Sequence, residues 1–141
     1  SSLLITGEKG VGKKLAAQNI HYLSPRASRS YVDMNCSAVP EELVESEIFG
    51  IEKGAMPGVD RTRKGKLDLA AGGTLYLSEV TALPLHVQVR LLNFIEEKKY
   101  SRIGGTEKIE NDVRILASTT ADIEKEVREG RFRPDLYAKL N

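Results

Sequence analysis

LLITGEKGVGKKLAAQNI, residues 3–20, decides the fold class of this chain. Its apolar start, residues 3–6, predicts a short buried strand, and the spacing of apolar residues after Gly12 predicts a helix over residues 13–22. The inner face of that helix is expected to carry Leu15, Ala16, Ile20 and Leu23. A strand that passes through a glycine-rich loop directly into a helix is typical of folds in which helices pack on a parallel sheet.

Apolar segments further along the chain extend this pattern. They predict strands at 31–36, 73–78 and 112–119, and helices at 41–50, 85–98, 123–130 and 132–140. The inner faces are expected at Leu43, Val44, Ile48 and Phe49 of the second helix and at Val87, Leu91, Leu92 and Ile95 of the third. The glycine- and charge-rich stretch 51–65 predicts an irregular excursion, and a Gly-Gly pair within 102–110 predicts a hairpin. The sequence therefore predicts an α/β fold with a mostly parallel sheet and helices on both faces.

Composition limits the class of protein. The chain has 141 residues, 40% hydrophobic and 29% charged, with a net charge of +1, as expected for one soluble domain over residues 1–141. Cys36 is the only cysteine, which excludes a disulfide framework and suits the reducing cytoplasm. No apolar run approaches the ~20 residues of a membrane-spanning helix. Because LYAKLN ends within a helical pattern, we expect a fragment of a longer protein.

GEKGVGKK, residues 7–14, fits the phosphate-binding pattern G-x-x-x-x-G-K at Gly7, Gly12 and Lys13. Glycines let backbone N–H groups surround a phosphate, and the lysine reaches the terminal phosphates. The alternative is a simple glycine turn with a surface lysine, but the expected strand before it and helix after it favour phosphate binding. The match is incomplete because Lys14 occupies the position where Ser or Thr normally helps to hold magnesium.

GGTLYLSEV, residues 72–80, places Ser78 and Glu79 at the end of a buried strand. In phosphate-binding folds of this kind, a neighbouring strand ends in an acid that holds the metal, and a second acid often activates water. Glu79 fits the second role, whereas Ser78 stands where the first acid is expected. The alternative is that either residue only starts the following helical segment.

Four segments together resemble a known family: GEKGVGKK, MNCSAVPEELVESEIFGIEKGAMPG, GGTLYLSEV and VRILASTTADIEKEVREGRFRPDLYAKLN. They are similar, in order and spacing, to the central AAA+ ATPase domain of bacterial enhancer-binding proteins, the sigma-54-dependent activators of the nitrogen-regulator type. The resemblance covers nearly the whole chain. It implies a P-loop AAA+ α/β subdomain whose helical lid lies outside this sequence.

The resemblance implies roles for individual residues. ATP or ADP is expected at Gly7, Glu8, Lys9, Gly10, Val11, Gly12, Lys13 and Lys14. The implied catalytic residues are Glu79, which polarises the attacking water, Asn35, which restrains Glu79, and Arg133, which reaches the nucleotide of a neighbouring subunit in a ring. Thr119 and Thr120 lie in the sensor strand. The loop that contacts sigma-54 corresponds to Gly54, Ala55, Met56, Pro57, Gly58 and Val59.

Several of these positions depart from the family's usual residues. The metal-binding aspartate is Ser78, the sensor asparagine is Thr120, and the second arginine of the ring interface is Lys139. In the partner loop, Met56 replaces Phe, Pro57 replaces Thr and Val59 replaces Ala. We therefore expect a domain that keeps its fold and nucleotide site, has no dedicated metal residues, and binds magnesium weakly because of Ser78 and Lys14.

The expected function is that of a nucleotide-binding domain in a cytoplasmic bacterial transcriptional regulator related to response regulators, with weak or absent ATP hydrolysis and impaired sigma-54 contact. The alternative is an active ATPase that remodels sigma-54 holoenzyme despite the substitutions. A small-molecule kinase is disfavoured because the resemblance extends far beyond the P-loop. Ring self-association is expected in the full-length protein, but no DNA binding by this fragment. His21 and His86 are expected on helix surfaces, and RTRK at 61–64 in a solvated loop.

Overall fold

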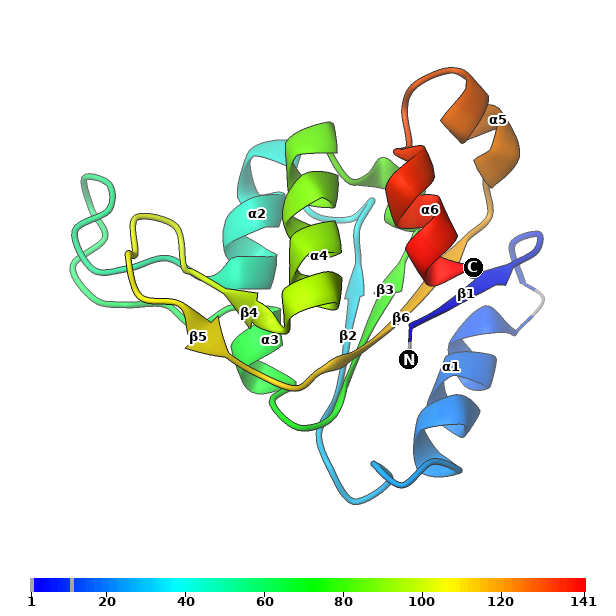
Figure 1. The fold of residues 1–141 in the computed structure, drawn as a ribbon, viewed down its shortest axis with the longest axis horizontal. Coiled ribbons are helices and arrows are strands. Elements are labelled where there is room, and N and C mark those ends of the chain that lie inside the picture. The colour runs from blue at the N-terminus through cyan, green and yellow to red at the C-terminus, as the bar shows by residue number, and fades with distance from the viewer. Residues whose placement is uncertain (1, 11) are drawn as a thin grey trace.

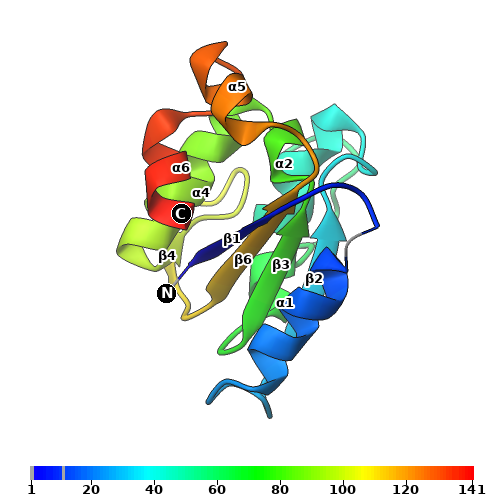
Figure 2. The same cartoon turned by 90° about the vertical axis from the view of Figure 1, so that its right-hand side faces the viewer.

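The central sheet consists of four parallel strands within residues 2–10 and 12–141, the part of the chain that this computed structural model describes. Their spatial order is β1 (Leu3–Thr6), β6 (Arg114–Thr119), β3 (Thr74–Ser78) and β2 (Tyr31–Asn35), which Figure 2 shows side by side. Residues 74–77 of β3 are all buried, as expected for a central strand of a parallel sheet that is covered on both faces. The sequence-based prediction of a parallel sheet is confirmed.

Helices cover both faces of this sheet. They are α1 (Lys13–Tyr22), α2 (Glu41–Phe49), α3 (Lys66–Leu69), α4 (Leu85–Glu97), α5 (Ile123–Arg128) and α6 (Pro134–Leu140). Figure 1 shows α2 and α4 beside each other on one side of the sheet and α1 on the other. The larger apolar core lies under α2, α4 and α6, whereas a smaller cluster of Ala17, Tyr76 and Leu116 lies under α1. None of the described helices is long and apolar enough to cross a membrane.

The buried faces of α2 and α4 agree with the prediction except at Leu43, the first residue predicted for α2, and at Ile95, the last residue predicted for α4. Val44, Ile48 and Phe49 of α2 are buried, but Leu43 is 48% exposed, so the prediction for Leu43 was wrong. In α4, Val87, Leu91 and Leu92 are buried as expected, Ile95 is half-buried, and Phe94 is fully buried. The elements packed against α2 and α4, which are α3, α6 and the segment after α4, determine which of these apolar side chains are buried.

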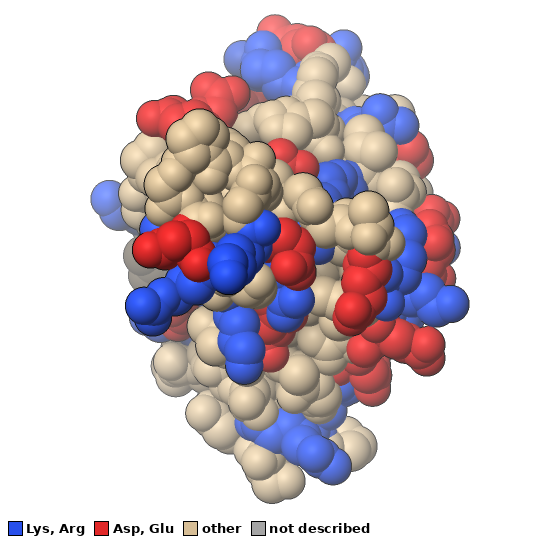
Figure 3. Space-filling view, turned by 90° about the vertical axis from the view of Figure 1, so that its left-hand side faces the viewer, with Lys and Arg blue, Asp and Glu red and all other residues tan. Residues whose placement is uncertain are grey.

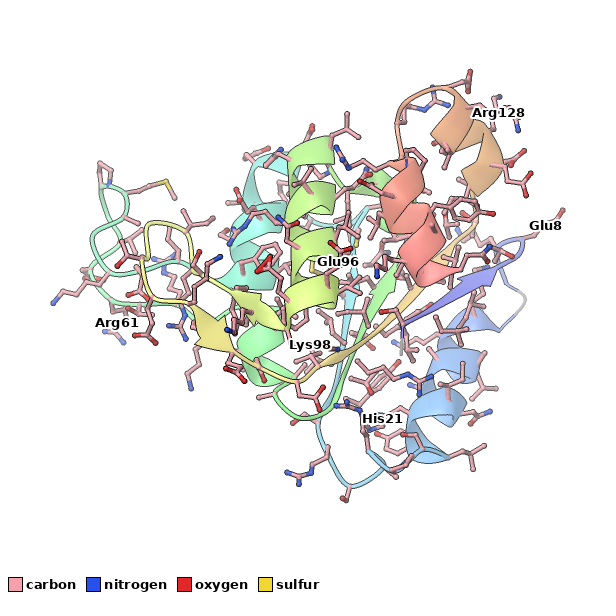
Figure 4. All side chains as sticks on the ribbon, in the orientation of Figure 1. Glu8, His21, Arg61, Glu96, Lys98 and Arg128 are labelled. Atoms are coloured by element: carbon pink, nitrogen blue, oxygen red, sulfur yellow. The ribbon has the colours of Figure 1, made fainter. Side chains whose placement is uncertain are left out.

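The predicted inner face of α1 was wrong at Leu15 and Leu23, whereas Ile20 is partly buried against the small cluster under α1 as expected. Leu15 and Leu23 are 61% and 88% exposed, and Ala17 and His21 are buried instead. The expected surface position of His21 is corrected as well, because its side chain is 0% exposed and lies between α1 and the strands (Figure 4). Its Nδ1 lies 2.7 Å from Thr74 Oγ1 and its Nε2 3.2 Å from the Arg29 carbonyl oxygen. Two hydrogen bonds offset the cost of burying this polar ring, which hydrophobic spacing alone does not reveal.

Two loops extend from one end of the molecule in Figure 1. One is the predicted excursion after α2, and the other connects β4 (Lys99–Tyr100) to its antiparallel partner β5 (Ile109–Glu110). The Gly-Gly hairpin is confirmed, although its paired arms begin before residue 102 and enclose a wider loop. An isolated bridge between Ile51 and Ile103 joins the two loops, and a second bridge between Ile51 and Arg63 closes the base of the excursion. Figure 3 shows positive and negative side chains interspersed on this side of the molecule, consistent with a solvated RTRK segment.

Candidate nucleotide-binding site

The carboxyl ends of the four parallel strands meet at one edge of the sheet, where ligands bind in folds of this architecture. A cavity of about 510 Å³ opens at this edge. It is lined by Lys9, Gly10, Gly12, Lys13, Lys14, Asn35, Ser37, Tyr76, Ser78, Glu79, Ser118 and Thr120. The fold therefore brings the glycine-rich loop and the ends of β2, β3 and β6 together around a single hollow.

The glycine-rich loop forms a cradle at the start of α1. Gly10 and Gly12 have positive φ angles of 86° and 81°, and a Cβ atom added at either would meet nothing within 4 Å. Both therefore need glycine for their backbone conformation and leave the adjoining space open. Gly12 is the N-cap of α1, whose first N–H groups favour an anion. Residue Val11, which the sequence also assigned to nucleotide binding, lies outside the described residues.

Lys13 holds this loop closed. Its Nζ donates to the carbonyl oxygens of Gly7, at 3.0 Å, and Glu8, at 2.6 Å. An ammonium group has three donors, so one N–H remains for a ligand in the cavity. The polyphosphate of a nucleotide fits this donor set: glycine backbone, helix N-terminus and lysine.

Glu79 is the carboxylate that lines the cavity, and it is anchored by the residue that follows the neighbouring strand β6. Its Oε1 accepts a hydrogen bond from the Thr120 backbone N–H at 3.0 Å, and its Oε2 accepts one from the Thr120 hydroxyl at 2.8 Å. The backbone of Glu79 is left-handed, with φ of 52°, a conformation uncommon outside glycine. Such outliers persist where the surroundings fix them, which is frequent at functional sites.

Asn35 lines the same cavity but bonds elsewhere. Its Oδ1 accepts hydrogen bonds from the backbone N–H of Ser37, at 3.0 Å, and from the Ser37 hydroxyl, at 2.7 Å. The restraint of Glu79 by Asn35 stays a prediction, because the Glu79 carboxylate is bonded to Thr120 in this structure. Beside Asn35, burial, with a smaller contribution from the Glu79 carboxylate, raises the pKa of the Cys36 thiol to about 12.

Three cavity residues were missed in the sequence: Ser37, Tyr76 and Ser118. The Tyr76 hydroxyl lies 2.6 Å from Ser118 Oγ, and both side chains are buried. Side chains alternate between the two faces of a strand, so Tyr76 lies on the same face as Ser78, and Ser118 on the same face as Thr120. This alternation could have indicated Tyr76 and Ser118 from the sequence. The predicted sensor residue Thr119 lies on the other face, where its Oγ1 is 2.9 Å from Thr81 Oγ1.

Lys14 extends along the side of the site. Its Nζ lies 3.4 Å from Asp33 Oδ2 on β2. The two residues also line a second hollow of about 200 Å³, which shares Lys14, Asn35, Tyr76 and Ser78 with the main cavity. Ser78 lines both hollows as well, and its Oγ lies 3.5 Å from the Met34 carbonyl oxygen.

Arg133 and the partner loop do not belong to this cavity lining. The Arg133 guanidinium donates to both carboxylate oxygens of Asp135, at 3.0 and 2.8 Å, and thereby lowers the pKa of Asp135. Lys139, near the C-terminal end of α6, has its Nζ 3.7 Å from Glu96 Oε2 on α4. Both cations are partly exposed on the surface of the chain.

The loop of residues 54–59 is closed by two backbone hydrogen bonds. Gly54 N–H donates to the Val59 carbonyl at 2.8 Å, and Val59 N–H donates to the Met56 carbonyl at 3.1 Å. Met56 is 48% exposed at this tip. Figure 4 places Arg61 of the same excursion and Glu8 of the glycine-rich loop at opposite ends of the molecule. Any effect of the cavity on this loop must therefore pass through the body of the fold.

Comparisons with known proteins agree with this geometry. A model of the sigma-54 interaction domain family matches residues 1–141. The Nif-specific regulatory protein of Azotobacter vinelandii is 48% identical over 141 residues, which are 100% of this chain and 27% of that protein. The DNA-binding transcriptional regulator NtrC of Proteus hauseri is 47% identical over 140 residues, 99% of this chain and 30% of that protein. The chain thus spans less than a third of the length of these relatives.

Solved structures show the same fold. NtrX from Brucella abortus superposes with a TM-score of 0.92 at 39% identity, covering 100% of this chain and 31% of that one. NtrX from the same organism in complex with ATP gives a TM-score of 0.91 at 38% identity, over 100% of this chain and 30% of the other. The P-loop NTPase domain of a sigma-54 activator from E. coli, at 17% identity and a TM-score of 0.62, shares the fold alone. The chain therefore belongs to the sigma-54 interaction domain family and has the α/β fold of a P-loop AAA+ domain.

Proposed function

We propose that this chain is the nucleotide-binding core of a cytoplasmic bacterial transcriptional regulator and that ATP or ADP binds in the 510 Å³ cavity. The observation that carries the proposal is the convergence of the glycine cradle, Lys13 and Glu79 on one hollow. NtrX from Brucella abortus has been solved in complex with ADP and with ATP, which supports the same ligand class for this related chain. The polyphosphate would contact the backbone of residues 7–14 and the free N–H of Lys13.

Hydrolysis at this site is weak or absent in our proposal. Glu79 can accept a proton from, or orient, a water molecule in the cavity, and Thr120 fixes its carboxylate. The strand-end acid expected one residue earlier is replaced by Ser78, which brings no charge. Each lost charge-assisted hydrogen bond of this kind is worth ~1.5–3 kcal/mol, which corresponds to roughly 10- to 150-fold in rate.

In this proposal, the remaining predicted site residues act on the nucleotide of a neighbouring copy or on other residues of the site. Arg133 reaches the nucleotide of a neighbouring copy in a ring formed by the full-length protein, after exchanging Asp135 for phosphate oxygens. Lys139 supports this contact less well than arginine, because an ammonium cannot form the bidentate pair that guanidinium forms. Asn35 restrains Glu79 in a state other than the one described. Thr120, which lines the cavity, senses the terminal phosphate, whereas Thr119 faces Thr81 and does not contact the nucleotide directly.

The loop of residues 54–59 is the proposed contact to sigma-54, and that contact is impaired. Pro57 fixes φ and removes a backbone N–H donor at the loop tip. Met56 is exposed and flexible, and it lacks an aromatic ring for a rigid anchor. A rival function, an active ATPase that remodels sigma-54 holoenzyme, is favoured by the presence and firm anchoring of Glu79.

Calorimetric titration of ATP and ADP into the full-length protein, with magnesium present, tests nucleotide binding. We expect saturable binding that Lys13→Ala weakens about tenfold or more, because a charged hydrogen bond to phosphate is lost. Lys125→Ala is the matched control, since Lys125 is an exposed lysine of the short helix α5 and does not line the cavity. Absence of binding, or equal loss in both variants, would contradict the proposed nucleotide site.

A further inference from the structure

Lys14 lies on the boundary between two hollows of the structure. It lines both the 510 Å³ cavity and the 200 Å³ hollow beside it, where its Nζ is 3.4 Å from Asp33 Oδ2. The two side chains are 67% and 44% exposed. Ion pairs with this exposure are weak, typically below about 1 kcal/mol, so a more highly charged anion can displace the carboxylate.

The side chains around the cavity do not fit a magnesium ion. P-loop NTPases hold this ion with a Ser or Thr directly after the phosphate-binding lysine and with an acid at the strand end. Lys14 has no lone pair to offer and repels a cation, and Ser78 is neutral. The carboxylate of Glu79 is already engaged by Thr120. Within residues 2–10 and 12–141, no cluster of three or more His, Cys, Asp or Glu side chains could hold a metal.

The same side chains supply positive charge directly. Three lysines line the main cavity, Lys9, Lys13 and Lys14, against a single carboxylate, Glu79. The N-terminus of α1 adds the partial positive charge of its unpaired N–H groups. The cationic side chains of the protein can thus neutralise a bound polyphosphate, a role that a bound metal ion has in other P-loop sites.

We propose that the cavity binds the polyphosphate of ATP or ADP without a divalent cation, and that Lys14 exchanges Asp33 for a phosphate oxygen when the nucleotide binds. The inference rests on the nucleotide site of the proposed function and specifies its metal requirement. Lys14 takes over the charge neutralisation that magnesium gives elsewhere, and Asp33 holds the ammonium close to the site beforehand.

Calorimetry of the full-length protein with ADP and ATP, once with magnesium and once with excess EDTA, tests this proposal. We expect the Kd in EDTA to lie within about threefold of the Kd in magnesium. Lys14→Ala should raise the Kd in EDTA about tenfold or more, because one charged contact is lost. Lys125→Ala, at an exposed lysine that does not line the cavity, should leave both values unchanged.

Two further variants distinguish the exchange from a loss of structure. Asp33→Asn frees Lys14 from its carboxylate and should lower the Kd in EDTA, a gain that misfolding cannot produce. Combining Lys14→Ser with Ser78→Asp supplies both missing metal residues, and it should make binding about tenfold or more tighter in magnesium than in EDTA. Circular dichroism confirms that each variant is folded.

The outcomes separate this inference from the proposed function. Binding that occurs only with magnesium, or metal-free binding that Lys14→Ala leaves unchanged, overturns the inference while the nucleotide site stands. An unchanged Kd in Asp33→Asn contradicts the exchange step. Absence of binding with and without magnesium overturns both the inference and the proposed site.

Discussion

The carboxylate of Glu79 receives both of its described hydrogen bonds from one residue, Thr120, which directly follows the neighbouring strand β6. Glu79 and Thr120 are 41 positions apart in the sequence, and the parallel pairing of β3 with β6 brings them together. The acid at the end of β3 is thereby fixed to the strand that is expected to sense the nucleotide. A change in the position of Thr120 therefore changes the position of the carboxylate.

Thr120→Val should loosen this contact. It removes the hydroxyl donor but keeps the backbone N–H, and we expect the free energy of unfolding to fall by about 0.5–1.5 kcal/mol. Thr120→Ser retains the hydroxyl and should stay within about 0.5 kcal/mol of the wild type. Urea denaturation of all three proteins measures the difference, and equal stabilities would show that the hydroxyl contact contributes nothing.

His21 should matter for stability, and His86 should not. His21→Ala removes a fully buried ring and leaves Thr74 Oγ1 without its partner, so we expect a loss of about 2–4 kcal/mol. The side chain of His86 is 66% exposed on α4, and His86→Ala should change the free energy of unfolding by less than about 0.5 kcal/mol. Thermal and urea unfolding of both variants test this contrast, which similar losses in the two proteins would contradict.

The Cys36 thiol should react slowly with disulfide reagents at neutral pH. The thiolate is the reactive form, and a pKa raised to about 12 keeps the buried group protonated over the physiological range. Because the pKa is raised, reactivity should increase only as the pH approaches that value or as the protein unfolds. Labelling with a chromogenic disulfide at pH 8 should proceed at least about tenfold slower in the native protein than in urea. Rapid native labelling would show that Cys36 is accessible and ionised.

Contact with sigma-54 should fail in the wild type and return with an altered loop tip. We expect a pull-down of the full-length protein with sigma-54, in ADP and aluminium fluoride, to recover no complex. Met56→Phe combined with Pro57→Thr supplies an aromatic anchor and a backbone N–H donor, and should restore retention. Retention of the wild type that is lost in Met56→Ala would contradict the impaired contact.

Local sequence patterns predicted much of this fold, but they did not predict contacts between residues that are far apart in the sequence. The strand, glycine-rich loop and helix of residues 3–22 follow one another in the sequence, so their chemistry is readable there. The face that α1 buries is not readable, because contact with β3 and Tyr31 selects Ala17 and His21 over the more apolar Leu15 and Leu23. Likewise, the pairing of Lys14 with Asp33 depends on the position of β2 beside α1, which no local spacing encodes.

ATP turnover tests the central claim, that this domain binds nucleotide but hydrolyses it poorly. Steady-state phosphate release is measured for the full-length protein with saturating ATP and magnesium, beside Ser78→Asp, Glu79→Gln and an NtrC-type relative. The account predicts a rate at least about tenfold below that of the relative, not restored by Ser78→Asp alone. A rate equal to that of the relative, dependent on magnesium and abolished by Glu79→Gln, would contradict it.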